Sequence, residues 1–376
     1  YELAGEEFNI NSTIQLGNIL FEKLKLTSSK KTKKGYSTDV DALEKIKDEH
    51  PIVNKILEYR GLTKLNSTYV EGMLPYINEN TKRIHSFFHQ TVTATGRISS
   101  TEPNLQNIPT RIELGKRLRK VFKPREGYVF IDADYSQIEL RLFAHMANAT
   151  NLIDAFVSGK DIHKKTASDI FGVDIDHVTP QMRYNAKAVN FGILYGISSF
   201  GLSEDLNIDV KSAKKFIDDY LNTYPRIKDY MDNVIKEAHR LGYVKTIMNR
   251  KRTIDELNNK NYIIRQSGER IALNTPIQGS SADIIKLAMI EIHKKLNEEH
   301  FKSKMVLQIH DELVFDVCID EKEKLEQLVK DIMENCYKLD VPLVVEMYTT
   351  DEEGNEVDLI NVEDPQLKVM MPLLIS

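Results

Sequence analysis

Residues 128–141, Tyr-Val-Phe-Ile-Asp-Ala-Asp-Tyr-Ser-Gln-Ile-Glu-Leu-Arg, are the most informative stretch of this sequence. The apolar run over 128–134 predicts a strand, and the residues from Gln137 to Met146 predict a helix directly after it. Asp134 ends the strand, where a carboxylate can point into a cleft at the edge of a sheet. Ionised carboxylates are preferred ligands of Mg²⁺, although a single aspartate at a strand end is more commonly a helix cap or a turn residue.

A second acidic group lies further along the chain. Two strand-forming runs between Met305 and Ile319 flank His310-Asp311-Glu312, which predicts a hairpin with these three residues at its tip. The tip lacks the Asn-Gly or Asp-Gly pair that a relaxed two-residue turn prefers. Adjacent like charges cost free energy unless a cation lies between them. A metal-binding turn and a solvated acidic tip both remain open from these residues alone.

A third group combines cations with aromatic rings. Four residues recur at every fourth position and share one side of a predicted helix: Arg183, Lys187, Phe191 and Tyr195. Thr179 suits the N-cap of this helix and Pro180 its first turn. Cations beside a helix N-terminus can hold phosphate groups, and the rings can stack on a base. The other interpretation is an ordinary amphipathic helix with core aromatics and solvated cations.

Together, these three groups predict chemistry on phosphates. Two separated acids suit two metal ions about 4 Å apart, which activate an attacking oxygen and stabilise a leaving oxygen. A cationic helix suits a triphosphate, because phosphoryl transfer requires positioning and charge neutralisation more than covalent chemistry. Nucleotidyl transfer is the reaction that this combination serves.

The remaining pattern predicts helices and short strands in an α+β order. Helices are expected over 11–26 and 39–74, a basic loop over 27–38, a strand over 82–92 and irregular polar chain over 93–111. Helices are then expected to about residue 298. A helix near 321–338 and a strand from Pro342 to Glu346 follow the hairpin.

Composition narrows the class of protein. The chain has 376 residues, of which 41% are hydrophobic, and this length suggests two or three packed units. No apolar run approaches the ~18 residues of a membrane helix, and the first residues do not resemble a signal peptide. The missing initial Met suggests an excised piece of a longer protein. Cys318 and Cys336 cannot build a disulfide framework, so we expect a reducing, intracellular setting.

The net charge of −5 argues mildly against a nucleic-acid partner, but local charge matters more. Two basic clusters are present: Lys30, Lys31, Lys33 and Lys34, and then Arg111, Lys116, Arg117, Arg119, Lys120, Lys123 and Arg125. The first cluster suits a solvated loop. The second is denser in arginine and leads into the strand that ends at Asp134.

These motifs resemble those of family A DNA polymerases, from about residue 3 to residue 346. They are Asp-Tyr-Ser-Gln-Ile-Glu-Leu-Arg at 134–141, Arg-x₃-Lys-x₃-Phe-Gly-x₂-Tyr-Gly at 183–196 and His-Asp-Glu at 310–312. Supporting stretches are Thr95-Gly96-Arg97, Asn104-Leu105-Gln106-Asn107-Ile108-Pro109 and Pro276-Ile277-Gln278-Gly279. The resemblance implies a right-hand architecture with an antiparallel palm sheet, helical fingers and a partial helical thumb.

The family pattern also implies a division of the chain. Residues 1–78 are expected to form the partial thumb, 79–138 and 297–346 the palm, and 139–296 the fingers. The tail over 347–376 departs from the family, because the usual Gly-x-Gly and Trp are missing. Seven acidic residues and no basic one lie between Asp351 and Asp364. The exonuclease, 5′-nuclease and early thumb regions are missing as well, so no proofreading is expected of this chain.

The resemblance assigns roles at the reaction centre. Asp134 and Asp311 match metal-binding aspartates, and Glu312 matches a supporting acid; two Mg²⁺ ions are implied, with Mn²⁺ as a substitute. The residues that match dNTP contacts are Arg183, Lys187, His163, Gln137, Phe191, Tyr195 and Glu139. Among them, Phe191 is expected against the sugar, Tyr195 near the template base, and Glu139 as the steric gate below the sugar 2′ position.

Primer–template contacts follow in the same way. Arg97 and Gln278 are expected to probe the minor groove near the primer end, where correct base pairs present nearly the same acceptors. Further matches to DNA contacts are Arg60, Lys64, Gln106, Asn107, Arg270, Asn274 and His310. The expected partners are therefore primer–template DNA and dNTPs. We also expect no membrane association, a monomer, and a cytoplasmic, nucleoid-associated location in a bacterial or phage-like setting.

Two other functions compete with this interpretation. A single-subunit RNA polymerase shares the architecture, but the Glu139 carboxylate would crowd a ribose 2′-OH. A nucleic-acid-binding module without catalysis would not need Asp134, Asp311, Arg183 and Lys187 together. The identities of these residues therefore favour a DNA polymerase over both.

Overall fold

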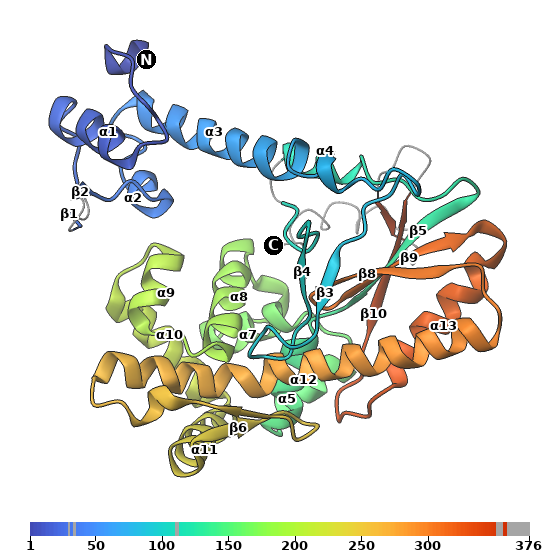
Figure 1. The fold of residues 1–376 in the computed structure, drawn as a ribbon. Coiled ribbons are helices and arrows are strands. Elements are labelled where there is room, and N and C mark those ends of the chain that lie inside the picture. The colour runs from blue at the N-terminus through green and yellow to red at the C-terminus, as the bar shows by residue number, and fades with distance from the viewer. Residues whose placement is uncertain (29–30, 33–34, 110–112, 351–355, 359–376) are drawn as a thin grey trace. The chain divides into compact units, whose positions relative to one another are not determined.

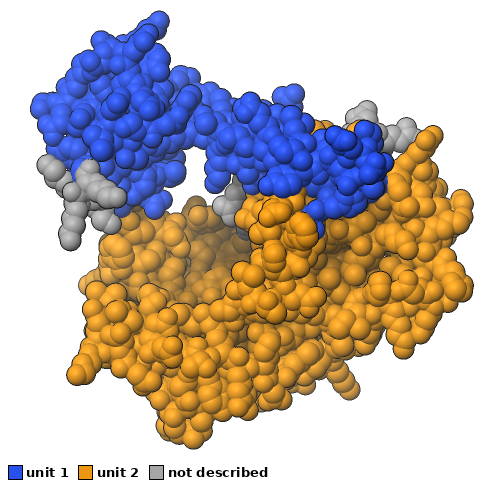
Figure 2. Space-filling view, in the orientation of Figure 1, with its two compact units in different colours: residues 1–86, 112–118 blue, residues 87–111, 119–376 orange. Residues whose placement is uncertain are grey.

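The computed structural model of the chain describes residues 1–28, 31–32, 35–109, 113–350 and 356–358. It divides into unit 1, residues 1–86 and 112–118, and unit 2, residues 87–111 and 119–376 (Figure 2). Several parts of the predicted basic clusters and of the predicted tail lie outside the described residues: Lys30, Lys33, Lys34, Arg111, 351–355 and 359–376.

Unit 1 is mainly helical. Its elements are η1 (Glu2–Ala4), α1 (Thr13–Gly17), η2 (Asn18–Lys23), β1 (Lys31–Thr32), β2 (Gly35–Tyr36), α2 (Val40–Glu44), α3 (Pro51–Leu65), η3 (Asn66–Val70), η4 (Leu74–Tyr76) and most of α4 (Glu113–Arg119). The Ser12 hydroxyl caps α1 by accepting from the Gln15 amide, which confirms a capped helix start there. Buried side chains such as Leu20, Leu43 and Val53 form its core.

A five-stranded antiparallel sheet organises unit 2. Its order is β11 (Glu356–Asp358), β10 (Val345–Thr350), β5 (Tyr128–Tyr135), β9 (Glu312–Cys318) and β8 (Lys304–Ile309). Because β5 lies between β10 and β9, segments far apart in the sequence meet on one strand. The predicted strand over 128–134 and the predicted hairpin are confirmed.

Helices and two small hairpins make up the rest of unit 2. The elements are β3 (Phe87–His89), β4 (Ser99–Thr101), α5 (Ile138–Met146), α6 (Thr150–Val157), α7 (Ile162–Phe171), η5 (Ile175–His177), α8 (Pro180–Leu194), α9 (Ser199–Leu206), α10 (Val210–Thr223), α11 (Pro225–Leu241), β6 (Tyr243–Lys245), β7 (Lys251–Thr253), η6 (Asp255–Asn258), α12 (Tyr262–Glu298), η7 (Ile319–Glu321) and α13 (Lys322–Asn335). Helices mixed with antiparallel strands confirm the α+β class.

The two faces of the sheet differ in chemistry because side chains alternate along a strand. Ile131, Ala133 and Tyr135 of β5 are buried and belong to one apolar cluster with Leu313 and Phe315 of β9. The alternate β5 residues Asp132 and Asp134 therefore occupy the opposite face. The apolar face holds the sheet in the core, and the other face is left for carboxylates.

Helix α12 connects the helical part of unit 2 with the sheet, and Figure 1 shows its length. It continues through Pro276, which cannot donate a backbone hydrogen bond. The Ser280 hydroxyl donates to the Pro276 carbonyl one turn later in the same helix. None of the helices in the described part of the chain has the length and apolar character that a membrane crossing requires.

Some predicted boundaries were wrong. In the segment predicted as a strand over 82–92, only Phe87–His89 forms one, where it pairs with Ser99–Thr101. The last predicted strand begins at Val345 instead of Pro342 and continues to Thr350. The residues after Glu346 therefore continue the sheet before the chain leaves the described region. The predicted helical block also missed the β6–β7 hairpin.

Arg125, a member of the second basic cluster, has a structural partner. Arg125 Nε lies 2.7 Å from Asp316 Oδ2, and Asp316 is buried. The Arg125 guanidinium also lies 3.7 Å from the centre of the Tyr128 ring. Arg125 therefore connects the start of β5, through the Tyr128 ring, with Asp316 of β9.

Gly268 of α12 gives a test of the packing. A Cβ atom there would lie 2.9 Å from the Leu257 backbone nitrogen and 2.9 Å from Glu256 Cβ, so Gly268→Ala should destabilise unit 2 by roughly 1–3 kcal/mol. Gly61→Ala is the matched control, because a Cβ at this helical glycine meets no described atom within 4 Å. Thermal unfolding measures both, and an unchanged melting temperature for Gly268→Ala would contradict this packing.

Candidate active site

Three strands bring carboxylates together on the polar face of the sheet. Asp134 of β5 pairs in register with Glu312 of β9 on one side and with Glu346 of β10 on the other. Residues directly opposite each other in an antiparallel pair point to the same face. The Asp311 carbonyl accepts a hydrogen bond from the Tyr135 amide at 3.2 Å, which places the hairpin turn beside the end of β5. The structure thus unites the two acidic groups that the sequence singled out.

The electrostatics of Asp134 favour a bound cation. Burial, and then the negative charges of Asp311, Glu312 and Glu346, raise the pKa of the Asp134 carboxyl to about 9. Burial also raises the pKa of Asp311, although the positive charge of Arg97 opposes this shift. Asp134 Oδ1 is enclosed and finds no hydrogen-bond partner among the described residues. Positive charge placed here would stabilise both ionised carboxylates.

These residues fit a divalent cation that is only partly held by protein. The described part of the chain contains no group of three or more His, Cys, Asp or Glu side chains that could hold a metal ion by themselves. Mg²⁺ is commonly bound through one or two carboxylates together with water and substrate phosphates. Asp134 and Asp311 supply that kind of incomplete donor set.

Hydrogen bonds from two glutamine side chains stabilise the turn that carries Asp311. His310 has a left-handed backbone with φ of 52°, and the Gln308 amide donates to its carbonyl at 2.7 Å. The Gln106 amide in turn donates to Gln308 Oε1 at 3.1 Å. Gln106 and His310, both expected at the DNA, are thus joined to the acidic turn. Burial and the positive charge of Arg97 lower the pKa of His310.

Glu139 is the centre of a second network. It is buried, with 7% of its surface exposed, and its carboxylate accepts from Arg97 Nη2 at 2.5 Å and from the Tyr195 hydroxyl. Burial raises the pKa of Glu139, whereas Arg97 and Tyr195 oppose that shift. The rings of Tyr195 and Phe191 are stacked with centroids 6.4 Å apart. Four residues predicted to contact substrates therefore form one connected group.

Helix α8 carries the predicted phosphate contacts. The Thr179 hydroxyl accepts from the Met182 amide at 3.2 Å and Pro180 occupies the first turn, which confirms the predicted helix start. Arg183 Nε donates to Asp161 Oδ2 at 2.8 Å. Asp161 also caps α7 through the amides of His163 and Lys164. One carboxylate thus places Arg183 beside the start of the helix that carries His163.

The loop that carries Arg97 is held by α12 and the β6–β7 hairpin. Gly96 has φ of 83°, and a Cβ there would lie 2.4 Å from the Arg250 guanidinium carbon. Lys286 Nζ donates to the Gly96 carbonyl at 2.6 Å. Arg250 is itself held by Asp283 Oδ1 at 2.9 Å and by the Gly279 carbonyl at 2.9 Å. Only glycine at 96 allows this close approach.

Other predicted contacts have less defined surroundings. Gln137 has a left-handed backbone and occupies the N-cap of α5. On α12, Arg270 lies against Gly196, Gln278 is half-buried, and Asn274 Oδ1 is buried with no partner in the described region. The substrate-contact roles of these residues stay predictions, as do the DNA-contact roles of Asn107, Arg60 and Lys64. Arg60 donates to the Thr38 carbonyl and, with Lys64, lies in unit 1.

Sequence reasoning missed several residues that shape the site. Asp161 precedes a helix start, a signal that could have indicated a cap. Glu346 was expected only as the end of a strand. Arg250 and Lys286 carry no local signal beyond charge, because their contacts with Gly96 depend on tertiary packing.

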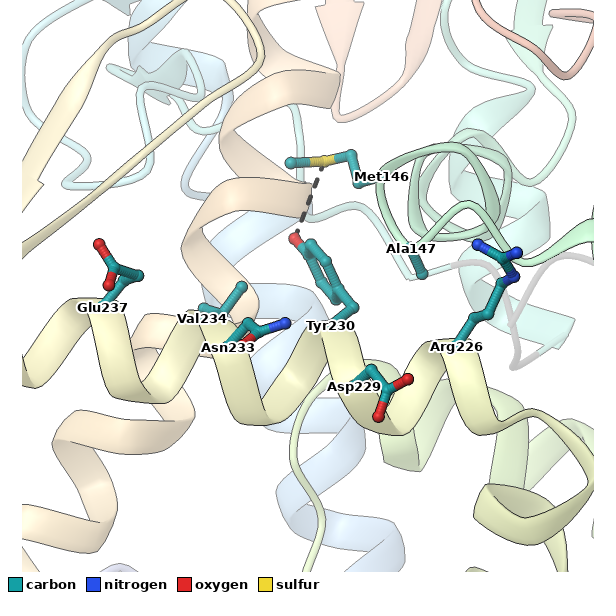
Figure 3. A pocket seen from close by; sticks show the side chains of 8 residues that line it. All are labelled: Met146, Ala147, Arg226, Asp229, Tyr230, Asn233, Val234 and Glu237. Carbon is teal, nitrogen blue, oxygen red and sulfur yellow. Dashed lines mark hydrogen bonds between the residues drawn. The ribbon is translucent and has the colours of Figure 1, made fainter.

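A cavity of about 430 Å³ lies elsewhere in unit 2, between the end of α5 and one side of α11 (Figure 3). The eight side chains that line it do not include Asp134 or Asp311, and the Tyr230 hydroxyl points to the Met146 sulfur at 4.0 Å. This cavity is separate from the acidic cluster. The acidic face is therefore the better candidate for chemistry.

Several known proteins have sequences similar to this one. The model of DNA polymerase family A matches residues 1–354. The chain is 54% identical over 347 residues to DNA polymerase I of Caldicellulosiruptor bescii and 53% identical over 347 residues to DNA polymerase I of Bacillus subtilis. Each match covers 92% of this chain but only 41% and 39% of the relatives, so the chain spans about two fifths of their length.

A solved structure shares the fold. It is described as the POL domain of Pol1 from M. smegmatis in complex with DNA primer-template and dNTP. The TM-score is 0.88 at 44% identity, and the match covers 93% of this chain and 62% of that one. Sequence and fold therefore agree on the relationship, and this chain belongs to DNA polymerase family A.

Proposed function

We propose that this chain is the polymerising core of a DNA-template-directed DNA polymerase. It adds dNMPs to a primer 3′-OH by two-metal-ion nucleotidyl transfer. The observation that carries the proposal is the pair Asp134 and Asp311, in which the enclosed Asp134 oxygen has no partner in the described region. Family membership, and the DNA and dNTP named for the M. smegmatis relative, support the choice of substrates.

In this proposal, each of the three groups has a separate task. Asp134 and Asp311 hold two Mg²⁺ ions, and when bound these supply Lewis-acid charge neutralisation at the reacting phosphate. Arg183, Lys187 and His163 bind the triphosphate at the start of α8. The developing negative charge is then met by groups already in position, which is how such sites accelerate phosphoryl transfer.

The aromatic and acidic network selects the nucleotide. The Glu139 side chain occupies the space below the sugar 2′ position and leaves no room for a ribose hydroxyl. Phe191 packs against the sugar, and Tyr195 lies near the template base. Arg97 and Gln278 probe the minor groove, where correct pairs share acceptors.

We propose the right-hand division of the family for this chain. The antiparallel sheet formed by β5, β8, β9 and β10 supports a palm made from 79–138 and 297–346. The helices from α5 to α12 support fingers over 139–296, and the helical residues 1–78 correspond to the thumb. All three groups come from one polypeptide, which supports a monomer, and a DNA substrate implies a place at the nucleoid.

Primer extension tests the reaction. Asp134→Asn and Asp311→Asn should each lower the rate of dNMP addition by orders of magnitude, because each removes a metal ligand while keeping the side-chain volume. Binding of primer–template should survive, and omission of Mg²⁺ should abolish extension by the parent chain. Asp320→Asn is the control at an exposed position. Near-parental rates in either test variant would remove that aspartate from the proposed centre.

The same assay examines two further points. A mismatched primer incubated with Mg²⁺ and without dNTPs should stay at full length, because we propose no editing by this chain. Extension with dNTPs but not with rNTPs separates a DNA polymerase from an RNA polymerase. Binding without extension would instead indicate a non-catalytic module.

The raised pKa of Asp134 predicts a stability gain when this carboxyl is replaced by a neutral amide. The pKa of Asp134 is about 9 in the folded chain and is ordinarily 3.8, so the folded state binds more protons than the unfolded state between these values. Its contribution to stability therefore falls as pH rises through this window. In EDTA at pH 7, Asp134→Asn should have a higher melting temperature and a free energy of unfolding larger by on the order of 1 kcal/mol, which is more than surface substitutions usually give.

Added Mg²⁺ should narrow this difference, because a ligand that binds the folded parent stabilises it. Asp320→Asn serves again as the control and should leave the melting temperature unchanged. A lower melting temperature for Asp134→Asn in EDTA would contradict the raised pKa of Asp134 from which this prediction follows.

Sugar selection gives a separate prediction. Glu139→Ala should raise rNMP incorporation relative to dNMP incorporation, because it opens the space that the carboxylate fills. Glu139→Gln keeps the volume but removes the ion pair with Arg97, so it should retain most of the discrimination. The ratio of incorporation rates for matched rNTP and dNTP pairs is the measurement. An unchanged ratio in Glu139→Ala would refute the steric role.

A further inference from the structure

A buried polar cluster connects α7 with α8. Asn190 and His163 each expose 1% of their surface, and Thr166 exposes none. Buried polar groups of this kind cost free energy unless they are hydrogen-bonded. None of these contacts was expected from the sequence, which marked only His163.

The hydrogen bonds of this cluster point to one protonation state of the His163 ring. Asn190 Nδ2 lies 3.0 Å from His163 Nδ1 and 3.1 Å from the Thr166 hydroxyl. The Thr166 hydroxyl lies 3.2 Å from Asn190 Oδ1, so it contacts both ends of the Asn190 amide. An amide nitrogen only donates, which makes His163 Nδ1 the acceptor. The ring proton of a neutral histidine is then on Nε2.

Three charged groups act on this ring. Asp161 caps α7 through the His163 amide at 2.9 Å and pairs with Arg183. Burial lowers the pKa of His163 to about 4; Asp161 opposes this shift, and Arg183 and Lys187 add to it. The imidazole is therefore neutral at neutral pH. The Phe191 ring packs beside it, with centroids 5.8 Å apart.

We propose that Asn190 is a positioning residue that fixes His163 as the Nε2-protonated tautomer, so that the ring offers a neutral N–H donor to the triphosphate beside Arg183 and Lys187. The other tautomer would present a lone pair at Nε2, which repels a phosphate oxygen. A charged imidazolium would repel the two neighbouring cations. The inference rests on the proposed triphosphate site, but the tautomer itself is a property of the free chain.

The decisive measurement uses the whole chain without nucleotide, metal or DNA. Selective ¹⁵N labelling of its ten histidines, with His163→Gln to identify the signal, reports which ring nitrogen carries the proton. We expect an unprotonated Nδ1, a protonated Nε2 and no titration of this ring between pH 5 and 9. A protonated Nδ1 in the parent chain would overturn the proposal without any variant.

Two substitutions test the part played by Asn190. Asn190→Asp places an acceptor beside Nδ1, so the ring should become protonated there and titrate at a higher pH. Asn190→Leu keeps a similar volume but removes the donor, and the Nε2 preference should weaken. Asn185→Asp on the same helix is the control and should change neither. An unaltered tautomer in both Asn190 variants would overturn the assignment.

Kinetics connect the tautomer to nucleotide binding. Asn190→Asp should raise the KM for dNTP by on the order of tenfold, while the Kd for primer–template stays unchanged. An unchanged KM, with the tautomer altered as expected, would overturn the link to the triphosphate. If the parent chain shows the expected tautomer but extends no primer, the proposed function fails instead. The two failures are therefore distinguishable.

Discussion

The site depends on the crowding of like charges around Asp134. Its strand is paired on both sides, and each neighbour places a glutamate directly opposite the aspartate. The apolar face of the same strands fixes this arrangement, because a slip of one residue would turn Ile131, Ala133 and Tyr135 out of the core. Core packing therefore enforces an electrostatic arrangement that would be unfavourable by itself.

The second principle of the site is shared use of single side chains. Asp161 caps the start of one helix and accepts a hydrogen bond from the arginine of another. Glu139 joins Arg97, from the loop before β4, to Tyr195, at the end of α8. Such bridges fix the distances between the elements that they join. They also mean that the effects of single substitutions spread to a second residue, so that additivity should fail within these pairs.

The sequence was most informative where local pattern and burial agree. The apolar run before Asp134 and the two runs around His310 all form strands, because each run pairs with a neighbouring strand of the sheet. The alternation over 82–92 was misleading, since only Phe87–His89 finds a partner strand there. The last strand begins where Val345 pairs with Tyr135, after the predicted start at Pro342. At the site, the acids, the helix cap and the cationic stripe were predictable from spacing. The contacts of Asp161, Asn190 and Arg250 were not, because they join residues from different elements.

The loop of Arg97 has a further consequence for redesign. A Cβ atom at Gly96 would meet the Arg250 guanidinium, so the size of residue 96 and the position of Arg250 are linked. The Gly96 carbonyl accepts a hydrogen bond from Lys286 of α12, and Arg250 of the β6–β7 hairpin donates to the Gly279 carbonyl. These residues therefore fix the backbone position of the loop that carries Arg97. A library that varies residues 250 and 286 while keeping Gly96 should alter the proposed minor-groove contact of Arg97 without changing Arg97 itself. Tolerated sequences at these positions should covary, because each change in size or charge alters the same loop.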